Sequence, residues 1–186
     1  MRLLIQAIID LIFSIAMLLM TMYIILLAYS LGSWELPYVP TMRKARKVLK
    51  GYLHIKKQDK VLDLGSGLGR MVLFFSQYPI EVTGIEQRWY LYLVSRMRLF
   101  FHLFKKAKIH FVKGDFFKQS LKGYTIIYAF HIPRLIKKLA PILEPQLQKG
   151  QMLISYKFPY PFSLDHFTEE KLQDEPDSFF YIYRKK

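Results

Sequence analysis

Hydrophobic residues form one long, uninterrupted stretch near the N-terminus. It runs from Leu11 to Leu31, LIFSIAMLLMTMYIILLAYSL, and contains no charged side chain. At a rise of about 1.5 Å per residue, a helix of that length covers roughly 30 Å, the thickness of the hydrocarbon core of a bilayer. Upstream of it, Gln6 and Asp10 interrupt an otherwise apolar pattern, and a carboxylate is better tolerated near the lipid head groups. The pattern predicts a transmembrane helix over residues 11–31, within an N-terminal anchor of residues 1–31.

A cleaved signal peptide is the alternative for this segment, because Ala28-Tyr29-Ser30 resembles a cleavage site. The apolar stretch, however, exceeds the roughly 7–15 residues of a signal hydrophobic region, and Arg2 alone provides positive charge before it. Eight Lys and Arg residues follow it between Arg43 and Lys60. The positive-inside rule therefore predicts an outside N-terminus and a cytoplasmic C-terminal domain, or a mitochondrial-matrix domain if the source is eukaryotic.

After this segment, short apolar runs alternate with amphipathic segments. Residues 32–40, GSWELPYVP, are predicted to form a connector, because two closely spaced prolines cannot continue a helix. Apolar runs predict strands, and segments with helical periodicity predict helices. We expect strands at residues 60–64, 81–85, 108–112, 124–130 and 151–158, helices at residues 41–57, 70–77, 87–104 and 134–146, and a closing hairpin at residues 168–184.

Strands that alternate with helices and are apolar on both faces are typical of a parallel sheet covered on both sides. The expected fold class is therefore α/β: a Rossmann-like, doubly wound, mostly parallel sheet with a C-terminal antiparallel hairpin, preceded by one N-terminal transmembrane helix. The α/β domain is expected to occupy residues 41–186.

Charge and cysteine content limit the chemistry. With 28 Lys and Arg against 14 Asp and Glu, the formal net charge is +14, which favours anionic lipid, nucleic acid or acidic proteins as partners. The chain has no cysteine, which excludes disulfides, cysteine-ligated metals and a cysteine nucleophile. Its five histidines are scattered along the chain, so no metal site is expected.

The most informative segment lies between the first predicted strand and the helix after it, where the sequence reads Asp63-Leu-Gly-Ser-Gly-Leu-Gly-Arg70. Glycines suit a tight turn in which a ligand approaches the backbone closely, and the following helix presents free N–H groups. Arg70 occupies the position of the third glycine of a dinucleotide-binding loop, so binding of a pyrophosphate is less favoured.

Two carboxylates follow at the ends of later strands. Glu86, next to Gln87, closes the second strand 19 residues after Gly67, where an acid accepts hydrogen bonds from ribose hydroxyls. Asp115 closes the third strand, where it can accept from an adenine amino group while Phe116 packs on the ring. Each acid alone is as readily explained as a helix-terminal charge or a turn former. Their order, each at the C-terminal end of a strand, favours a nucleoside site.

The runs VLDLGSGLGR, GIE at 84–86 and GD at 114–115 resemble the motifs of class I S-adenosylmethionine-dependent methyltransferases over roughly residues 42–186. The apolar span, then Pro37-Tyr-Val-Pro-Thr41, then the glycine loop, is similar to small membrane-anchored protein-lysine methyltransferases, whose mitochondrial members modify an ATP synthase subunit and an adenine nucleotide carrier. The resemblance implies S-adenosyl-L-methionine as cofactor, bound by Asp63, Gly65, Ser66, Gly67, Gly69, Glu86, Gln87, Asp115 and Phe116.

Candidate catalytic residues are fewer. By position, the resemblance implicates Tyr38 and Thr41, because the segment that holds them covers the cofactor pocket in that family. His131, at the C-terminal end of the fourth predicted strand, is placed to accept a proton or orient the acceptor, although a structural histidine is an equal alternative. At this strand end, Ala129-Phe-His-Ile-Pro133 departs from the family's pattern and contains no [DN]-P-P-[YF] motif, which disfavours adenine or glutamine amino-methylation.

The predicted function is an S-adenosylmethionine-dependent methyltransferase that is anchored in a membrane and N-methylates a lysine of a membrane-associated protein. The lipid bilayer and that protein are the expected partners. Nucleic acid is a less favoured partner, because positive charge beside a span is an ordinary topology signal. A lipid or quinone methyltransferase, an RNA methyltransferase and an inactive cofactor-binding scaffold are the alternatives.

The predicted helix at residues 87–104 is apolar almost all round and is flanked by basic residues. A helix on a freely soluble domain is expected to carry a polar outer face. We therefore expect it to help seat the domain on the bilayer, with burial under the anchor or in a dimer as the alternative.

Overall fold

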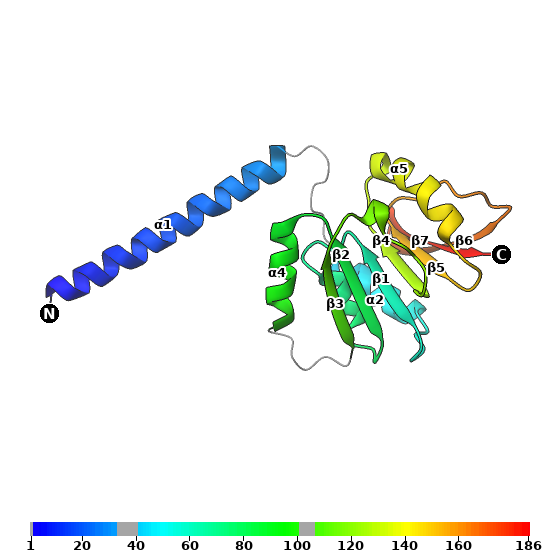
Figure 1. Cartoon of the computed structure of the whole chain (residues 1–186), viewed down its shortest axis with the longest axis horizontal. Coiled ribbons are helices and arrows are strands. Elements are labelled where there is room, and N and C mark those ends of the chain that lie inside the picture. The colour runs from blue at the N-terminus through cyan, green and yellow to red at the C-terminus, as the bar shows by residue number, and fades with distance from the viewer. Residues whose placement is uncertain (1, 33–40, 101–106) are drawn as a thin grey trace. The chain divides into compact units, whose positions relative to one another are not determined.

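The computed structural model describes residues 2–32, 41–100 and 107–186, and it divides into two compact units, residues 1–39 and 40–186. The first unit contains α1 (Arg2–Gly32), the long blue helix of Figure 1. Its segment Leu4–Leu26 has 23 residues and a mean hydropathy of 2.4, which by length and composition is enough to cross a membrane. Residues 33–40 of the predicted connector lie outside the described residues.

Helix α1 extends N-terminally of the span predicted at residues 11–31, through the polar residues Gln6 and Asp10. The side-chain amide of Gln6 donates a hydrogen bond of 3.0 Å to Asp10, one turn later. The Ser14 hydroxyl donates to the backbone carbonyl of Asp10 at 2.8 Å. These polar groups therefore find partners within the helix itself, and the helix continues through them.

The second unit is built on a seven-stranded sheet with the order β3-β2-β1-β4-β5-β7-β6. Neighbouring strands among β1 to β5 are parallel, whereas β7 is antiparallel to both β5 and β6. The predicted Rossmann-like, mostly parallel sheet with a C-terminal antiparallel hairpin is thereby confirmed. The strands are β1 (Lys60–Leu64), β2 (Glu81–Glu86), β3 (Lys108–Lys113), β4 (Ile126–Ala129), β5 (Met152–Tyr156), β6 (Phe167–Glu175) and β7 (Ser178–Lys185).

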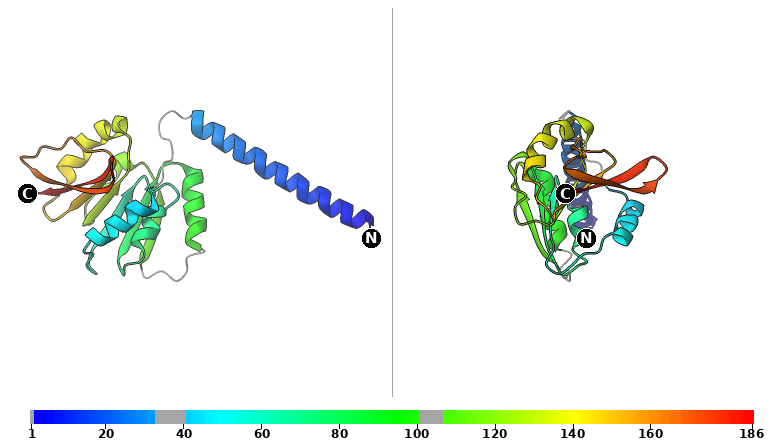
Figure 2. Two further views of the ribbon diagram at one scale, coloured as in Figure 1. Left: turned by 180° about the vertical axis from the view of Figure 1, so that it is seen from behind. Right: turned by 90° about the vertical axis from the view of Figure 1, so that its right-hand side faces the viewer.

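Helices cover both faces of this sheet, with α2 and α5 on opposite sides (Figure 2). On one face, α2 (Arg43–Tyr52) and α3 (Arg70–Phe75) pack into a core with Val61, Val82, Ile126 and Ile154 of the central strands. The helix α4 (Trp89–Phe100) adds partly buried side chains to the same core. The other face is covered by α5 (Pro133–Leu143), and two short 3-10 helices, η1 (Phe116–Lys118) and η2 (Glu144–Gln146), follow β3 and α5.

Strand β1 shows how the sequence pattern distributes side chains between the faces. Successive residues of a strand point to opposite sides, so Val61 and Asp63 share the face of α2 and α3 while Leu62 and Leu64 point to the other. All four side chains are buried. Asp63, the single carboxylate of this strand, is therefore held inside the domain, two residues before Gly65, where the glycine loop begins.

Element boundaries differ from the prediction mainly at helix ends. Helix α2 ends at Tyr52 rather than residue 57, because Leu53 adopts an extended backbone conformation. The described part of α4 covers Trp89–Phe100, and the predicted continuation toward residue 104 lies outside the described residues.

Candidate functional site

The residues predicted to bind the cofactor gather at one edge of the sheet. Parallel strands end at a common edge, and ligands of open α/β sheets bind outside their carboxyl ends. The glycine loop follows β1, Glu86 closes β2, Asp115 follows β3 and His131 follows β4. The order β3-β2-β1-β4 makes these four strand ends neighbours.

The glycine loop turns back sharply and binds to strand β2. Gly65, Gly67 and Gly69 have φ angles of 82°, 54° and 72°, in the left-handed region that residues with a Cβ rarely adopt. The backbone N–H groups of Gly65 and Ser66 both donate to the carbonyl of Ile85, at 2.9 and 2.8 Å. This double contact fixes the start of the loop against the end of the neighbouring strand.

Close approach makes glycine necessary at two positions around this loop. A Cβ on Gly69 would lie 2.5 Å from the ring of Phe111 and 3.3 Å from Ser95. A Cβ on Gly84, in the middle of β2, would lie 2.8 Å from the Cβ of Ser66. In the GIE motif, Gly84 therefore lies against Ser66 of the glycine loop, and Glu86 is the last residue of strand β2.

Glu86 organises the loop through both carboxylate oxygens. Oε2 accepts a hydrogen bond of 2.7 Å from the backbone N–H of Gly67, and Oε1 accepts one of 2.8 Å from the N–H of Arg88. The side chain is 6% exposed, so these bonds form largely out of water. Charge-assisted bonds of this kind are stronger than neutral ones. Glu86 and Gly67 thus lie in direct contact, and Gln87 next to them is exposed.

Asp63 is a buried carboxyl at the same edge. It is 3% exposed, and burial, with a further contribution from the negative charge of Glu86, raises its pKa to about 8. A carboxyl with that pKa is mostly protonated at neutral pH, in contrast to an ordinary surface aspartate. A cation brought next to Asp63 would stabilise its ionised form.

Asp115 and Phe116 form the third part of the edge. Asp115 caps η1, where its Oδ1 accepts a hydrogen bond of 3.0 Å from the backbone N–H of Phe117. The ring of Phe116 is 3% exposed and packs against Phe117 and His131, with both ring centroids 5.1 Å away. Phe116 thus already forms part of the wall beside the glycine loop.

His131 lies between these elements and is 4% exposed. Its Nδ1 is 3.1 Å from the hydroxyl of Tyr160, and its Nε2 would lie 3.1 Å from a Cβ on Gly65. Burial lowers the pKa of His131 to about 4, although the backbone of Leu64 opposes the shift in part. The ring is therefore neutral at physiological pH, with one nitrogen facing the loop.

Tyr160 was not predicted as a site residue. It lies in Tyr160-Pro-Phe after β5, where nothing in the sequence distinguishes it from an ordinary core aromatic. The structure buries it, raises its pKa by burial and sets its hydroxyl on His131. Tyr160 thereby fixes the orientation of the imidazole.

Of the two candidate residues of the connector segment, Tyr38 and Thr41, the structure describes only Thr41. Tyr38 lies outside the described residues. Thr41 is 4% exposed, and its Oγ1 lies 2.6 Å from the hydroxyl of Tyr128 on β4. Tyr128 pairs in register with Asp63 on β1, so Thr41 binds to the strand next to the one that carries Asp63.

Two buried polar atoms at this edge have no hydrogen-bond partner among the described residues. They are Oγ of Ser66, in the glycine loop, and Nε2 of His131, facing Gly65. Buried polar atoms in folded proteins are rarely left without a partner. Together with the glycines of the loop, they fit the approach of a polar ligand.

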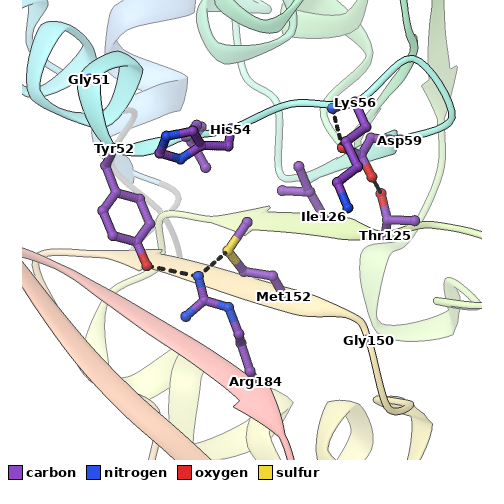
Figure 3. Close-up of a pocket in the computed structure, with 11 residues that line it drawn as sticks. Gly51, Tyr52, His54, Lys56, Asp59, Thr125, Ile126, Gly150, Met152 and Arg184 are labelled. Atoms are coloured by element: carbon purple, nitrogen blue, oxygen red, sulfur yellow. Dashed lines mark hydrogen bonds between the residues drawn. The ribbon is translucent and has the colours of Figure 1, made fainter.

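Other sites are less suited to the predicted chemistry. Among the residues described, no group of three or more His, Asp or Glu side chains is arranged to hold a metal ion. A cavity of about 540 Å³ lies at the opposite edge, where β1, β4 and β5 begin (Figure 3). There Arg184 donates to the Tyr52 hydroxyl and Asp59 accepts from Thr125, so its polar groups are largely bound to one another.

The fold and this edge together define a Rossmann-like domain of the S-adenosylmethionine-dependent methyltransferase class. A solved structure of an RNA methyltransferase from Salinibacter ruber, in complex with S-adenosyl-L-homocysteine, superposes with a TM-score of 0.66 over 79% of this chain and 94% of that one, at 24% identity. At that identity the match defines the fold alone.

Sequence comparison gives the family. The ANTKMT methyltransferase domain matches residues 63–163, more than half of the 186 residues, and the chain belongs to this family. It is 30% identical over 141 residues to the ATP synthase c-subunit lysine N-methyltransferase of Rattus norvegicus, covering 73% of this chain. It is 25% identical over 131 residues to a protein-lysine N-methyltransferase of Saccharolobus islandicus (strain REY15A), covering 67% of this chain and 78% of that protein. The match spans 62% of the length of the rat relative.

Proposed function

We propose that this protein is an S-adenosylmethionine-dependent methyltransferase that is anchored in a membrane by α1 and methylates a lysine side chain of a membrane-associated protein. The observation that carries the proposal is the contact between Gly67 and Glu86 at the carboxyl edge, inside the segment that matches the family. It combines a glycine-rich loop with a fixed carboxylate, which is what a nucleoside needs for close approach and ribose recognition.

In this proposal the cofactor is held by residues of three strand ends. The backbone of Gly65, Ser66, Gly67 and Gly69 faces its amino acid part, Glu86 and Gln87 its ribose, and Asp115 and Phe116 its adenine. Asp63 lies nearest to the positive charges of the amino acid part. When bound, S-adenosylmethionine supplies an activated methyl group on a cationic sulfur with a good leaving group.

The chain's own residues then orient the acceptor and exclude water. A lysine acceptor must be neutral to react, and burial favours the neutral amine. His131 is neutral at physiological pH, faces the loop through Nε2 and is oriented by Tyr160. It is therefore suited to accept a hydrogen bond from the neutral acceptor amine and so orient it, whereas a pKa of about 4 makes it too weak a base to take the proton of a lysine ammonium. Thr41, bound to Tyr128, holds the start of the domain against β4, and Tyr38 remains a prediction from the connector.

The anchor follows from the N-terminal helix. Leu4–Leu26 is long and apolar enough to cross a membrane, and the basic residues that follow favour a cytoplasmic or matrix location for the α/β domain. An enzyme fixed in this way meets acceptors in the same membrane at high effective concentration. The proposed acceptor is therefore a lysine of a membrane-associated protein. The names of the Rattus and Saccharolobus relatives, which specify lysine N-methylation, support the choice of acceptor atom.

Two measurements test the proposal. Calorimetry of the folded, full-length protein with S-adenosylmethionine or S-adenosylhomocysteine tests the cofactor, and absence of heat with both would overturn the assignment. Incubation with membranes and donor labelled on the methyl group, followed by separation of protein, lipid and RNA, tests the acceptor. Label in lysine of a membrane protein supports the proposal. Label in lipid or RNA, or in no fraction despite donor binding, selects one of the alternatives instead.

A further inference from the structure

Helix α4 exposes an apolar stripe formed by Trp89, Leu93, Val94 and Met97. Their exposed fractions range from 39% for Val94 to 57% for Trp89. Trp89, Leu93 and Met97 are spaced four residues apart, so they lie on one face of the helix. The inner face buries Leu91 and Ser95 and packs Tyr92 and Leu99 against the core, so α4 is apolar on both its inner and its outer side. This arrangement differs from that of a helix on a freely soluble domain.

Beside this stripe lies a depression of about 350 Å³ that is lined by four arginines. We call it the arginine pocket; its charged residues are Arg43 and Arg46 of α2, Arg70 of α3 and Arg98 of α4. Leu73 and Phe74 of α3 complete it, and no carboxylate of the described residues lines it. Guanidinium groups bind phosphate oxygens in bidentate geometry, so several arginines from three helices suit an anionic phosphate group.

The stripe and the pocket meet on α4. Val94 and Arg98 are one turn apart and are therefore neighbours on the helix surface. The Arg98 guanidinium donates a hydrogen bond of 3.0 Å to the carbonyl of Leu68, which holds it at the border of the stripe. A surface with exposed apolar side chains on one side and arginines on the other matches the boundary between lipid head groups and acyl chains.

We propose that this surface seats the methyltransferase domain on an anionic bilayer, with the apolar stripe at the acyl boundary and a lipid phosphodiester head group in the arginine pocket. The inference rests on the proposed anchoring by α1. Only eleven residue steps separate Gly32, the end of α1, from Arg43, so the chain between them reaches at most about 40 Å. An anchored α1 therefore keeps Arg43 within about 40 Å of the C-terminal end of that helix.

Charge favours a bilayer over a second copy of the chain. Helix α4 carries Arg96 and Arg98 and no acidic residue. Two copies that met through their stripes would bring these cations together, which is unfavourable. The formal net charge of +14 opposes association of copies and favours an anionic surface.

The two tryptophans of the chain, Trp34 and Trp89, allow the seat and the anchor to be tested separately. Full-length Trp34→Phe and Trp89→Phe variants are reconstituted into vesicles of phosphatidylcholine, alone or with phosphatidylglycerol as the minor component. Lipids brominated on their acyl chains quench tryptophan that reaches the acyl boundary. In the Trp34→Phe variant we expect Trp89 emission to fall at least about twofold in anionic vesicles, and by less in vesicles of phosphatidylcholine alone.

Matched charge reversals test the arginine pocket in the Trp34→Phe background. Arg43→Glu with Arg70→Glu is expected to abolish the additional quenching by anionic vesicles. Lys137→Glu with Lys138→Glu, exposed on α5, changes the net charge equally and is expected to leave the quenching unchanged. Equal quenching in both vesicle types, or equal loss with both pairs of substitutions, overturns the head-group site.

The apolar stripe has its own matched pair. Leu93→Gln with Met97→Gln is expected to remove Trp89 quenching, whereas Leu164→Gln, at an exposed leucine outside α4, is expected to retain it. Trp89 left unquenched while Trp34 is quenched in the Trp89→Phe variant overturns the seat and leaves the anchor intact. Unquenched Trp89 with blue-shifted emission that depends on protein concentration would identify a second copy instead. Binding of S-adenosylhomocysteine, measured in parallel, reports the proposed cofactor site independently.

Discussion

The hydroxyl oxygen of Thr41 lies 2.6 Å from the phenol oxygen of Tyr128. The contact joins residues 87 positions apart, and it connects the chain before α2 to the centre of the sheet. Tyr128 is in register with Asp63, whose charge contributes to the raised pKa of this tyrosine, although burial contributes more. Thr41, in the segment before α2, is thus linked to the strand next to the one that carries Asp63.

Replacement of Thr41 by valine is expected to destabilise the domain. The Tyr128 hydroxyl would lose its partner while buried, which typically lowers the free energy of unfolding by about 1–3 kcal/mol. Thr41→Ser retains a hydroxyl and is expected to keep most of that stability. Chemical unfolding of the two variants measures the difference. If valine and serine proved equivalent, the hydrogen bond would have no part in fixing this segment.

Asp63 is expected to release a proton when the cationic cofactor binds. Its pKa of about 8 lies above that of an unfolded aspartate, so the folded protein retains a proton that the unfolded chain loses, and stability falls as pH rises from about 4 to about 8. A nearby cation favours the ionised carboxylate, so affinity for S-adenosylmethionine should increase with pH over the same range. Calorimetry in two buffers with different ionisation enthalpies measures the released proton, and the Asp63→Asn variant should show none.

The Gly69→Ala variant tests the close packing of the glycine loop against Phe111. The added Cβ would lie 2.5 Å from the Phe111 ring, and overpacking of this kind typically lowers the free energy of unfolding by about 1–3 kcal/mol. Gly123→Ala is the control, because Gly123 has a similar φ of 85° but no atom within 4 Å of its Cβ position. Thermal or chemical unfolding should rank Gly69→Ala well below the control. Similar stabilities would mean that the loop moves away from Phe111 without difficulty.

Glu86→Gln is expected to weaken cofactor binding. The substitution removes the charge that accepts from Gly67 and Arg88 and that would bind the ribose, so we expect the affinity for S-adenosylhomocysteine to fall by roughly tenfold or more. Glu81→Gln makes the same change at the other end of β2, where Glu81 pairs with Lys60. Calorimetry should show normal affinity for that control. An unchanged affinity in Glu86→Gln would remove the ribose contact from the proposal.

His131 is expected to lower stability in mild acid. Its pKa of about 4 lies below that of an unfolded histidine, so the unfolded chain binds the proton first, and stability falls as pH decreases from about 6.5 to about 4. His131→Gln should lose less stability over this range than the unsubstituted protein, measured by unfolding at several pH values. His54→Gln, at an exposed position, is the control and should behave as the unsubstituted protein does.

Much of this architecture follows from the sequence. Strand β1 has the predicted bounds, 60–64, because a short apolar run that ends in glycines allows few alternatives. The positions of Glu86 and Asp115 at strand ends followed from the same alternation. The end of α2 at Tyr52 did not, because it depends on where Leu53 leaves the helix to enter the core.

The contacts between side chains were harder to predict from the sequence than the positions of residues at strand ends. Tyr128 lies within an apolar run, and its sequence context does not indicate that its hydroxyl binds Thr41. The same is true of Tyr160 and His131, which are 29 residues apart and meet only because the chain after β5 returns to the end of β4. The raised pKa of Asp63 depends on burial, which the DLG motif alone does not reveal.

The position of β7 has a consequence for biosynthesis. Strand β7 fills the place between β5 and β6, so neither neighbour is paired along that side until residues 178–185 have left the ribosome. Helix α1 emerges roughly 150 residues earlier, and at about 5–20 residues per second this leaves many seconds for insertion into a bilayer. In the membrane-anchored enzyme proposed above, delivery of the nascent chain to the membrane would therefore precede completion of the sheet.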